Sequence, residues 1–398
     1  MDYHYGSKPD EVDDFFRKKR SWSTVKDEIL GHYVDCYLKT VQNLQRRIII
    51  VDGFSGPGVF GDDTPGSPLI ICKSISQNTK GKVGIGCLFA DVRPAHRAAL
   101  EQNIAAYIKT GMSEPPYSDW SQALARALQI GGGATLFFYL DPYGIKELEF
   151  DMVRQIYERD PKKSTEVLIN FNFRTFMRMS GNWGYADSAS EVSRKVKQGK
   201  TDTVNQVMGG DYWQAIIMDP SLDKIGREDA VVNAYMERVR QFFPYVYAIP
   251  VKERSDEEYS VPTDELARYH LLFGTRSPRA VVYMNDVALN ALEPYLSQFR
   301  DGLLFDMTPE RYQAVAIEKA KEAIVQAVTT RPLKRPDIYE TVIPEFFMHR
   351  RKKDYRAIID ELAFKEHRLH PDTRTMKKTG QLNDDTLLSA RPWSRSVA

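Results

Sequence analysis

A glycine-rich loop that directly follows an apolar run is the part of this sequence best suited to chemistry. Residues 48–51 are apolar, Asp52 follows them, and three glycines then occur within residues 53–58. Glycine has no Cβ and tolerates positive φ, so the backbone of such a loop can pass close to a ligand. Asp52 ends the predicted strand at the edge where open α/β sheets bind their ligands. The pattern therefore predicts a ligand-binding loop.

This stretch resembles the first motif of class I S-adenosylmethionine-dependent methyltransferases, in which the loop wraps the methionine half of the cofactor. The resemblance implies that these residues bind S-adenosylmethionine: Asp52, Gly53, Phe54, Ser55, Gly56 and Gly58. Gly56, Gly58 and Gly61 also spell G-x-G-x-x-G, the dinucleotide fingerprint. Pro57 and the prolines at 65–68 argue against a helix that starts at once, which a dinucleotide site needs for its pyrophosphate. A nicotinamide or flavin site and a structural glycine turn are the alternatives.

Further charged residues lie where a cofactor of this type needs them. Asp91 follows the strand predicted over 84–90 and can accept both ribose hydroxyls, because a carboxylate offers two oxygens. The resemblance places Asp119 beside the adenine amino group and Lys26, ahead of the first strand, against the cofactor carboxylate. A strand-end or helix-cap aspartate is the structural alternative for both acids.

The turn Asp141-Pro142-Tyr143-Gly144 follows the clearest predicted strand, 134–140. It resembles the D/N-P-P-Y/F turn of amino-group methyltransferases, and without the second proline it looks more like the turn of guanine-N2 tRNA methyltransferases. The resemblance implies that the acid and a backbone carbonyl accept hydrogen bonds from the target amine while the aromatic ring stacks on a base. Asp141, Pro142 and Tyr143 are therefore the candidate catalytic residues. An Asp-Pro-x-Gly segment also favours an ordinary type I or II turn.

Predicted strands alternate with helices through residues 1–308. The strands are expected at 48–52, 84–90, 134–140, 167–171, 243–251 and 269–274. This order predicts an α/β fold with a doubly wound, Rossmann-like sheet of the methyltransferase type. Residues 172–240 are expected to form a helical insertion over the active site.

Residues 309–398 carry a surplus of five basic residues, although the net charge of the whole chain is only +1. The basic residues cluster at Arg350, Arg351, Lys352, Lys353, Lys377 and Lys378. Helices predicted at 310–329, 337–343 and 352–369, with a polar stretch after them, are typical of a winged helix-turn-helix domain. The segregated charge favours nucleic-acid binding by these clustered residues. An ordinary helical appendage with a solvated charged face is the alternative.

Composition excludes other classes of protein. The hydrophobic share of 42% and charged share of 27% are those of a soluble globular protein. Cys36, Cys72 and Cys87 form no C-x-x-C pair, which predicts reduced core thiols in a cytoplasmic protein and no metal site. The N-terminus lacks a secretory signal, and no apolar run approaches the roughly 18 residues of a membrane span.

Longer strings narrow the resemblance to one family. One family, the three-Cys-motif partner family TcmP, is similar to this chain in the segments 20–30, 51–58 and 66–69. The later part of the same family is similar to residues 269–275 and to a turn at 284–286. The resemblance implies a methyltransferase-like domain, a C-terminal winged helix and a possible three-Cys-motif partner protein, to which the cysteines of the name belong.

The sequence thus predicts an S-adenosylmethionine-dependent methyltransferase that N-methylates an amino group of a nucleic-acid base. One alternative is a non-catalytic module of the same fold that works with a partner enzyme on nucleic acid. Another is a methyltransferase for a small metabolite or a protein. The choice between DNA and RNA, the target atom and the oligomeric state stay open at this point.

Overall fold

The chain divides into two compact units, residues 1–276 and 277–398. The computed structural model describes residues 19, 21–79, 83–180, 191–251, 267, 269–297 and 317–392. The division falls before the boundary predicted at residue 308, because helix α12 (Pro278–Ser297) packs on helix α14 (Arg335–Val342) of the second unit.

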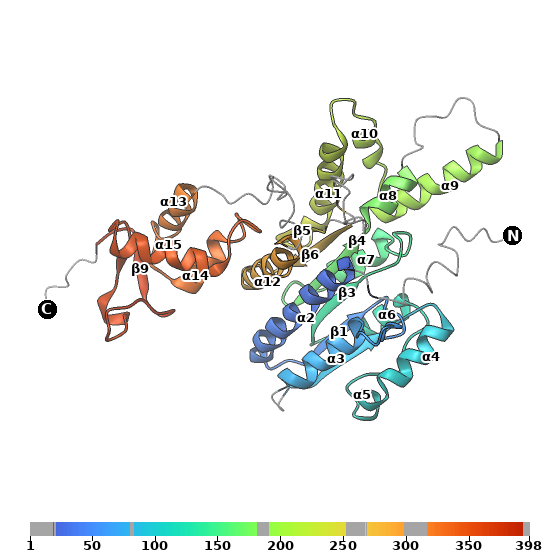
Figure 1. The fold of residues 1–398 in the computed structure, drawn as a ribbon, viewed down its shortest axis with the longest axis horizontal. Helices are drawn as coiled ribbons and strands as arrows, with labels where there is room; N and C mark the ends of the chain where they lie inside the picture. The colour runs from blue at the N-terminus through green and yellow to red at the C-terminus, as the bar shows by residue number, and fades with distance from the viewer. Residues whose placement is uncertain are drawn as a thin grey trace. The chain divides into compact units, whose positions relative to one another are not determined.

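A six-stranded sheet forms the centre of the first unit (Figure 1). Its strands are β1 (Ile48–Asp52), β2 (Ile85–Phe89), β3 (Thr135–Leu140), β4 (Thr165–Phe171), β5 (Tyr245–Val251) and β6 (Tyr269–Thr275). They lie in the order β2-β1-β3-β4-β6-β5. Strands β1 to β4 are parallel, whereas β6 runs antiparallel to both β4 and β5. The predicted α/β class with a mostly parallel sheet is confirmed.

A short additional pairing extends the sheet beside β2. Single parallel bridges join Cys87 to Ser113 and Ala90 to Tyr117. The Tyr117 N–H donates to the Phe89 carbonyl at 2.8 Å. The segment 113–117 therefore lies along the free edge of β2 and leads directly to Asp119.

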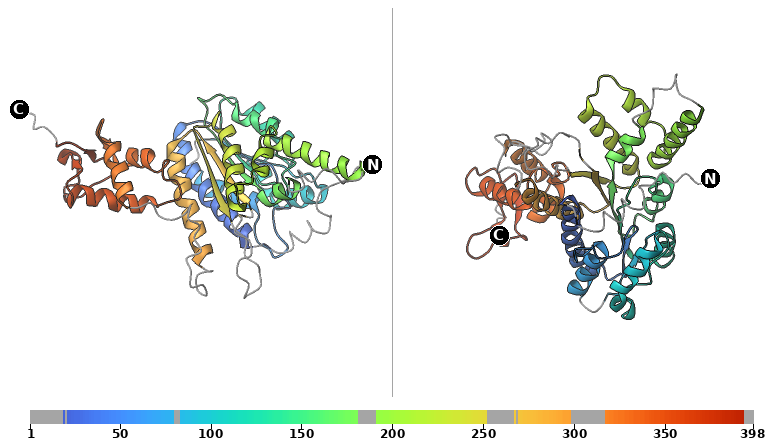
Figure 2. Two further views of the ribbon diagram at one scale, coloured as in Figure 1. Left: turned by 90° about the horizontal axis from the view of Figure 1, so that it is seen from above. Right: turned by 45° about the vertical axis from the view of Figure 1, so that its right-hand side comes forward.

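Helices α2 (Ser21–Val41) and α3 (Ser67–Asn78) cover one face of the sheet, and Figure 2 shows helices on both faces. The rings of Tyr33 and Tyr37 lie 5.7 and 5.4 Å from that of Phe137 on β3. Buried side chains recur along α2 at helical spacing, which is why this segment forms a helix against the sheet. A short 3-10 turn, Gln42–Leu44, links α2 to β1.

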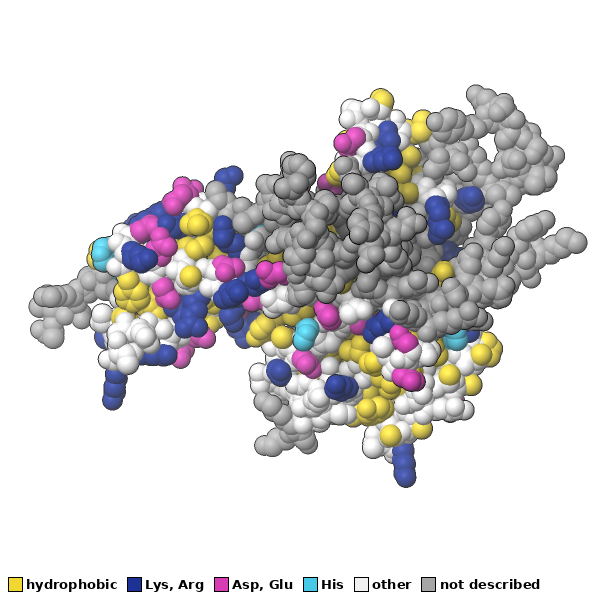
Figure 3. Space-filling model, in the orientation of Figure 1, with side chains coloured by type: hydrophobic (Ala, Val, Ile, Leu, Met, Phe, Trp, Pro, Cys, Tyr) yellow, Lys and Arg dark blue, Asp and Glu magenta, His cyan; other side chains and the backbone are white. Residues whose placement is uncertain are grey.

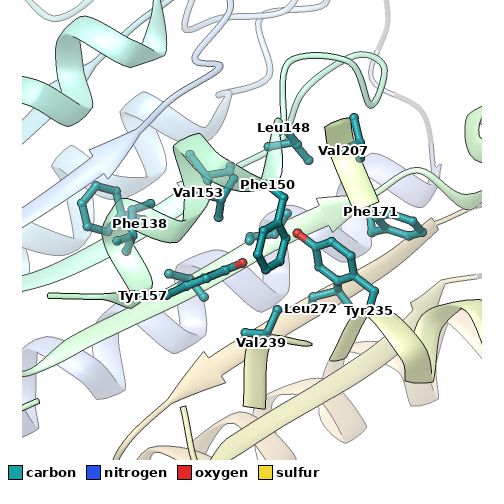
Figure 4. Packing of buried hydrophobic residues seen from close by; sticks show 14 of the residues in the cluster. Phe138, Leu148, Phe150, Val153, Tyr157, Phe171, Val207, Tyr235, Val239 and Leu272 are labelled. Atoms are coloured by element: carbon teal, nitrogen blue, oxygen red, sulfur yellow. The ribbon is translucent and has the colours of Figure 1, made fainter. Parts of the chain in front are cut away.

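The opposite face carries α6 (Trp120–Ile130), α7 (Phe150–Tyr157) and α11 (Lys224–Arg240). Phe138 points to this face because successive residues of a strand alternate in direction. In Figure 4 the ring of Phe150 lies between those of Tyr157 and Tyr235, with centroid distances of 6.2 and 5.9 Å. This cluster belongs to a large apolar core that also contains residues of β1 to β4.

The remaining helices of this unit connect the strands. Helices α4 (Pro94–Asn103) and α5 (Ala105–Lys109) follow β2. The segment predicted as a helical insertion contains α8 (Phe173–Ser180), α9 (Glu191–Met208), α10 (Trp213–Met218) and α11.

In the described residues of the second unit, four α-helices pack with a small sheet. Its further elements are α13 (Ile317–Ala327), β7 (Leu333–Lys334), α15 (Lys352–Phe364), β8 (His370–Pro371) and β9 (Leu387–Ser389). The sheet order is β7-β9-β8, with both pairs antiparallel. Buried residues on α13, α14 and α15 share one core, among them Ile324, Ile338, Ile359 and Leu362.

The turn predicted at 284–286 is wrong, because these residues lie inside α12. Val281, Met284 and Ala288 are buried at helical spacing, so the helix continues through the segment. Asn285 has a structural role there: its Nδ2 donates to the Arg350 carbonyl at 2.8 Å, and its Oδ1 accepts from the Met348 N–H at 2.8 Å.

Among the described residues, no helix is long and apolar enough to cross a membrane. The three cysteines are free thiols, and the Sγ atoms of Cys72 and Cys87 lie 3.8 Å apart in the core.

Candidate functional site

Asp52 ends β1 and is completely buried. Its carboxylate accepts hydrogen bonds from the Phe54 N–H at 3.1 Å and the Ser67 hydroxyl at 2.6 Å. Burial raises the pKa of Asp52 to about 7, and the hydrogen bond from Ser67 opposes part of that rise. Ser67, the first residue of α3, was not among the predicted site residues, since a serine at a helix start has many ordinary uses.

The glycine loop is held to the neighbouring strands by its backbone. The Gly53 N–H donates to the Tyr139 carbonyl at 3.0 Å, and the Ser55 N–H donates to the Ala90 carbonyl at 2.9 Å. The loop therefore lies across the carboxyl ends of β1, β2 and β3, where the sequence placed it.

Two of the loop glycines are required by the conformation of the chain. Gly56 and Gly58 have φ of 61° and 86°, values that other residues adopt only with strain. A Cβ on Gly58 would also lie 2.9 Å from Leu100 Cδ1. Glycine at these two positions is therefore explained by the backbone conformation, and at Gly58 also by the lack of space for a Cβ.

Asp91, which follows β2, is bonded to the glycine loop. Its Oδ2 accepts the Gly56 N–H at 3.0 Å, and its Oδ1 accepts the Arg93 N–H at 2.8 Å. Oδ1 also lies 3.3 Å from His96 Nδ1, whereas Oδ2 keeps capacity for another donor, as a ribose contact would need. The next residue, Val92, is 63% exposed and was missed by sequence reasoning, although an apolar side chain after a strand-end acid is a usable signal.

Asp119 is the N-cap of α6. Its Oδ1 accepts the Gln122 N–H at 3.1 Å, and the Ser121 hydroxyl donates to the same oxygen. These bonds, that of Ser121 first, hold the pKa of Asp119 below its usual range. Asp119 therefore has the helix-capping role that was its structural alternative. Its contact with an adenine stays a prediction.

Asp141, which follows β3, is the centre of a polar network. The ammonium of Lys26 forms an ion pair with Asp141 Oδ2. The Tyr139 hydroxyl donates to the same oxygen at 3.1 Å, and Asn170 Nδ2 donates to Oδ1 at 2.6 Å. Lys26, which was predicted to bind the cofactor, and Asp141, which was predicted to be catalytic, thus form one ion pair. Their side chains are 8% and 19% exposed, respectively.

The rest of the turn differs in exposure. Pro142 is buried, while Tyr143 is 46% exposed immediately after it. An exposed ring at this edge has the accessibility that stacking on a flat base requires, and the contact itself stays a prediction.

Lys19 ties the loop beyond the glycines to the start of α2. Its backbone N–H donates to Asp62 Oδ2 at 3.1 Å, and its Nζ donates to the Pro65 carbonyl at 2.9 Å. The same ammonium lies 2.5 Å from Asp27 Oδ2. Sequence reasoning missed Lys19, because its partners at 62–65 are far away along the chain.

The predicted basic residues of the second unit differ in exposure. Lys352 and Lys353 are exposed at the start of α15, and Lys377 and Lys378 are exposed in the turn between β8 and β9. Arg350 and Arg351 are only partly exposed, and Arg351 pairs with Glu293 of α12. In Figure 3 the basic side chains of this unit lie among acidic ones.

The matches to known proteins are matches to solved structures. No family model matches the chain, and no curated protein matches it. Twenty-one solved chains match. One is the crystal structure of protein LPL1258 from Legionella pneumophila strain Philadelphia 1, described under the family model DUF519. It is 10% identical, the match covers 70% of this chain and 94% of that chain, and the TM-score is 0.40.

Proposed function

We propose that this chain is an S-adenosylmethionine-dependent methyltransferase that acts on an amino group of a nucleic-acid base. The observation that carries the proposal is the 3.0 Å hydrogen bond from the Gly56 N–H to Asp91 Oδ2. It joins the glycine loop after β1 to the acid after β2 at the edge where open α/β sheets bind ligands. The parallel pairing of β1 with β2 and β3 supports the same proposal, because it brings the carboxyl ends of these strands together at that edge.

The residues at this edge have the chemistry that the cofactor needs. Asp91 offers a carboxylate to the ribose hydroxyls, and the exposed side chain of Val92 offers an apolar contact for the adenine. The backbone of the loop from Gly53 to Gly58 would hold the methionine half. When bound, S-adenosylmethionine supplies an electrophilic methyl group on a sulfonium.

Asp141 would orient the target amine by accepting a hydrogen bond from the N–H of that amine. The amine nitrogen forms the new N–C bond while the S–C bond breaks, and the surplus proton of the nitrogen passes to Asp141 or to water. Because this is an in-line displacement, correct orientation of the amine supplies much of the rate. The exposed Tyr143 would hold the base flat by stacking.

The second unit fits a winged helix-turn-helix domain, and its topology supports that proposal. Helices α13, α14 and α15 precede the β8–β9 hairpin, and the short strand β7 completes the sheet. Lys352 and Lys353 on α15 and Lys377 and Lys378 in the hairpin turn would contact phosphates. The resemblance to the TcmP family implies that the partner is a three-Cys-motif protein.

Calorimetric titration with S-adenosylhomocysteine tests the cofactor site. We expect the full-length protein to bind and Asp91→Ala to bind at least about tenfold more weakly, the effect of removing a partly buried charged acceptor. Asp151→Ala is the matched control, because Asp151 is an exposed acid on α7. Absence of binding by the unmodified protein would refute the proposal.

Incubation with isotopically labelled S-adenosylmethionine and either total RNA or genomic DNA tests methyl transfer. We expect a methylated nucleoside from one of the two pools, identified by mass spectrometry. Cofactor binding with no transfer to either pool, also in the presence of a three-Cys-motif partner, would favour the non-catalytic module.

A further inference from the structure

The ion pair between Lys26 and Asp141 assigns a role that differs from the one expected for this lysine. We propose that Lys26 is a positioning residue, which holds the carboxylate of Asp141 for the target amine and does not bind the carboxylate of the cofactor. This inference rests on the proposed function, since it concerns how the same site presents its acid.

The hydrogen bonds around Asp141 leave room for one further donor. A carboxylate has about four lone-pair sites, two on each oxygen. Lys26 and Tyr139 use those of Oδ2, and Asn170 uses one on Oδ1. The remaining site on Oδ1 can accept a single N–H, which is the contact that an amine about to be methylated needs.

Asp27 and Asp141, the two acids nearest Lys26 that pair with a cation, each already have an ammonium partner. Asp27, Asp52 and Asp141 interact electrostatically with one another. The only described ammonium groups paired with them are those of Lys19, on Asp27, and Lys26, on Asp141. The ammonium has three N–H groups, so a cofactor carboxylate could bind only through those not used by Asp141, close to acids that already interact with one another. It could not take the N–H on Asp141, because that acid is largely buried. Leaving that acid without its cation is costly.

The ring of Tyr269 limits the freedom of Lys26 from another side. The ammonium lies 5.4 Å from the centre of this ring, a favourable cation–π distance. With Lys26 held on α2 and Asp141 after β3, the pair fixes the orientation of the carboxylate across 115 residues of chain. The backbone of the glycine loop is then left to bind the carboxylate of the cofactor.

A pair of ligands separates the two roles of Lys26 without requiring methyl transfer. S-adenosylhomocysteine and its decarboxylated analogue differ only in the carboxylate, so the ratio of their affinities reports how the protein binds that group. We expect Lys26→Met to change this ratio by less than about twofold. Lys39→Met is the matched control, because Lys39 is exposed near the other end of the same helix.

Thermal denaturation then tests the link to Asp141. We expect Lys26→Met to lower Tm, and Asp141→Asn to restore part of the decrease when combined with it, because the double variant has no unpaired buried charge. On a substrate found by the labelling experiment, Lys26→Met should lower kcat at least about tenfold with little change in the KM for the cofactor, and Lys26→Arg should recover part of kcat.

The outcomes are distinct. A loss of at least about tenfold in affinity for S-adenosylhomocysteine in Lys26→Met, with unchanged binding of the decarboxylated analogue, would overturn the inference and return Lys26 to the cofactor. Additive effects of Lys26→Met and Asp141→Asn on Tm would overturn it as well. If the unmodified protein binds neither ligand, the proposed function itself fails.

Discussion

At the scale of single residues, the sheet contains two buried carboxyl groups that are bonded to hydroxyl groups. Asp52 accepts from Ser67, and Glu166 on β4 accepts from the hydroxyls of Tyr33 at 2.5 Å and Thr275 at 3.3 Å. Burial raises the pKa of each group to about 7. Both acids are therefore protonated in the folded protein at pH values where the unfolded chain has released those protons.

This arrangement predicts that the protein loses stability as the pH rises. The folded pKa values lie above the unfolded ones, so the stabilising contribution is complete below pH about 4 and is lost by pH about 7. We expect Asp52→Asn to reduce the slope of unfolding free energy against pH by about 1.4 kcal/mol per unit between about pH 5 and 6.5. Chemical denaturation across this range measures the slope.

Glu166→Gln is the control for that experiment, since it should reduce the slope by a similar amount at a position away from the ligand edge. An unchanged slope in Asp52→Asn would show that this acid is already ionised in the folded protein.

At the scale of elements, the glycine loop depends on a close approach to α4. Gly58 and Gly111 both have positive φ, 86° and 74°. Only Gly58 would bring a Cβ against a neighbour, Leu100, while nothing lies within 4 Å of a Cβ on Gly111. The two positions therefore separate backbone strain from steric contact.

We expect Gly111→Ala to lower the free energy of unfolding by about 1 kcal/mol, the effect of positive φ alone. Gly58→Ala should cost about 1 to 3 kcal/mol more, because the loop must also shift away from Leu100. It should weaken binding of S-adenosylhomocysteine, while Gly111→Ala should not. Equal decreases of stability in both variants would contradict this explanation of the loop.

The elements of the sheet were predictable, whereas the contacts within the site were not. Apolar runs that end in Asp52, Asp91 and Asp141 mark strands and their carboxyl ends, and this signal is local. The pairing of Lys26 with Asp141 depends on how α2 lies across the sheet, which a local pattern does not contain. At Asp119 the sequence alone could not decide between two roles. A helix N-cap and a contact with a ligand both favour an aspartate at this position.

Domain limits were harder to predict for a related reason. The apolar residues of α12, such as Val282, could serve either unit, and only their packing with the core of the second unit decides between them. The turn expected at 284–286 came from the family resemblance, and the helical packing of α12 that overturns it depends on tertiary contacts that a local motif does not contain.

At the scale of the whole molecule, the proposal divides the work between two units. The first would bind the cofactor and the target base, and the second would bind phosphates through four exposed lysines: Lys352, Lys353, Lys377 and Lys378. Phosphate binding contributes affinity that falls as the salt concentration rises.

We expect replacement of these four lysines by alanine in the full-length protein to weaken nucleic-acid binding. The slope of log K against log salt should decrease by about 0.7 to 0.9 for each phosphate that the variant no longer neutralises. Binding of S-adenosylhomocysteine should be unchanged. Fluorescence anisotropy at several salt concentrations measures the slope.

The matched control replaces four exposed lysines of the first unit: Lys39, Lys109, Lys162 and Lys224. If this control lowers the slope as much as the first set does, the second unit has no special part in binding.

The position of β6 in the sheet has a consequence for synthesis of the chain on the ribosome. Strand β4 pairs with β6, so that Phe171 lies opposite His270. About a hundred residues must be translated between them, which takes roughly 5 to 20 s at ordinary rates of synthesis. Until then β4, buried along its whole length in the finished protein, has an unpaired edge. A nascent chain halted before residue 269 therefore has an open apolar strand available to chaperones and to other nascent chains.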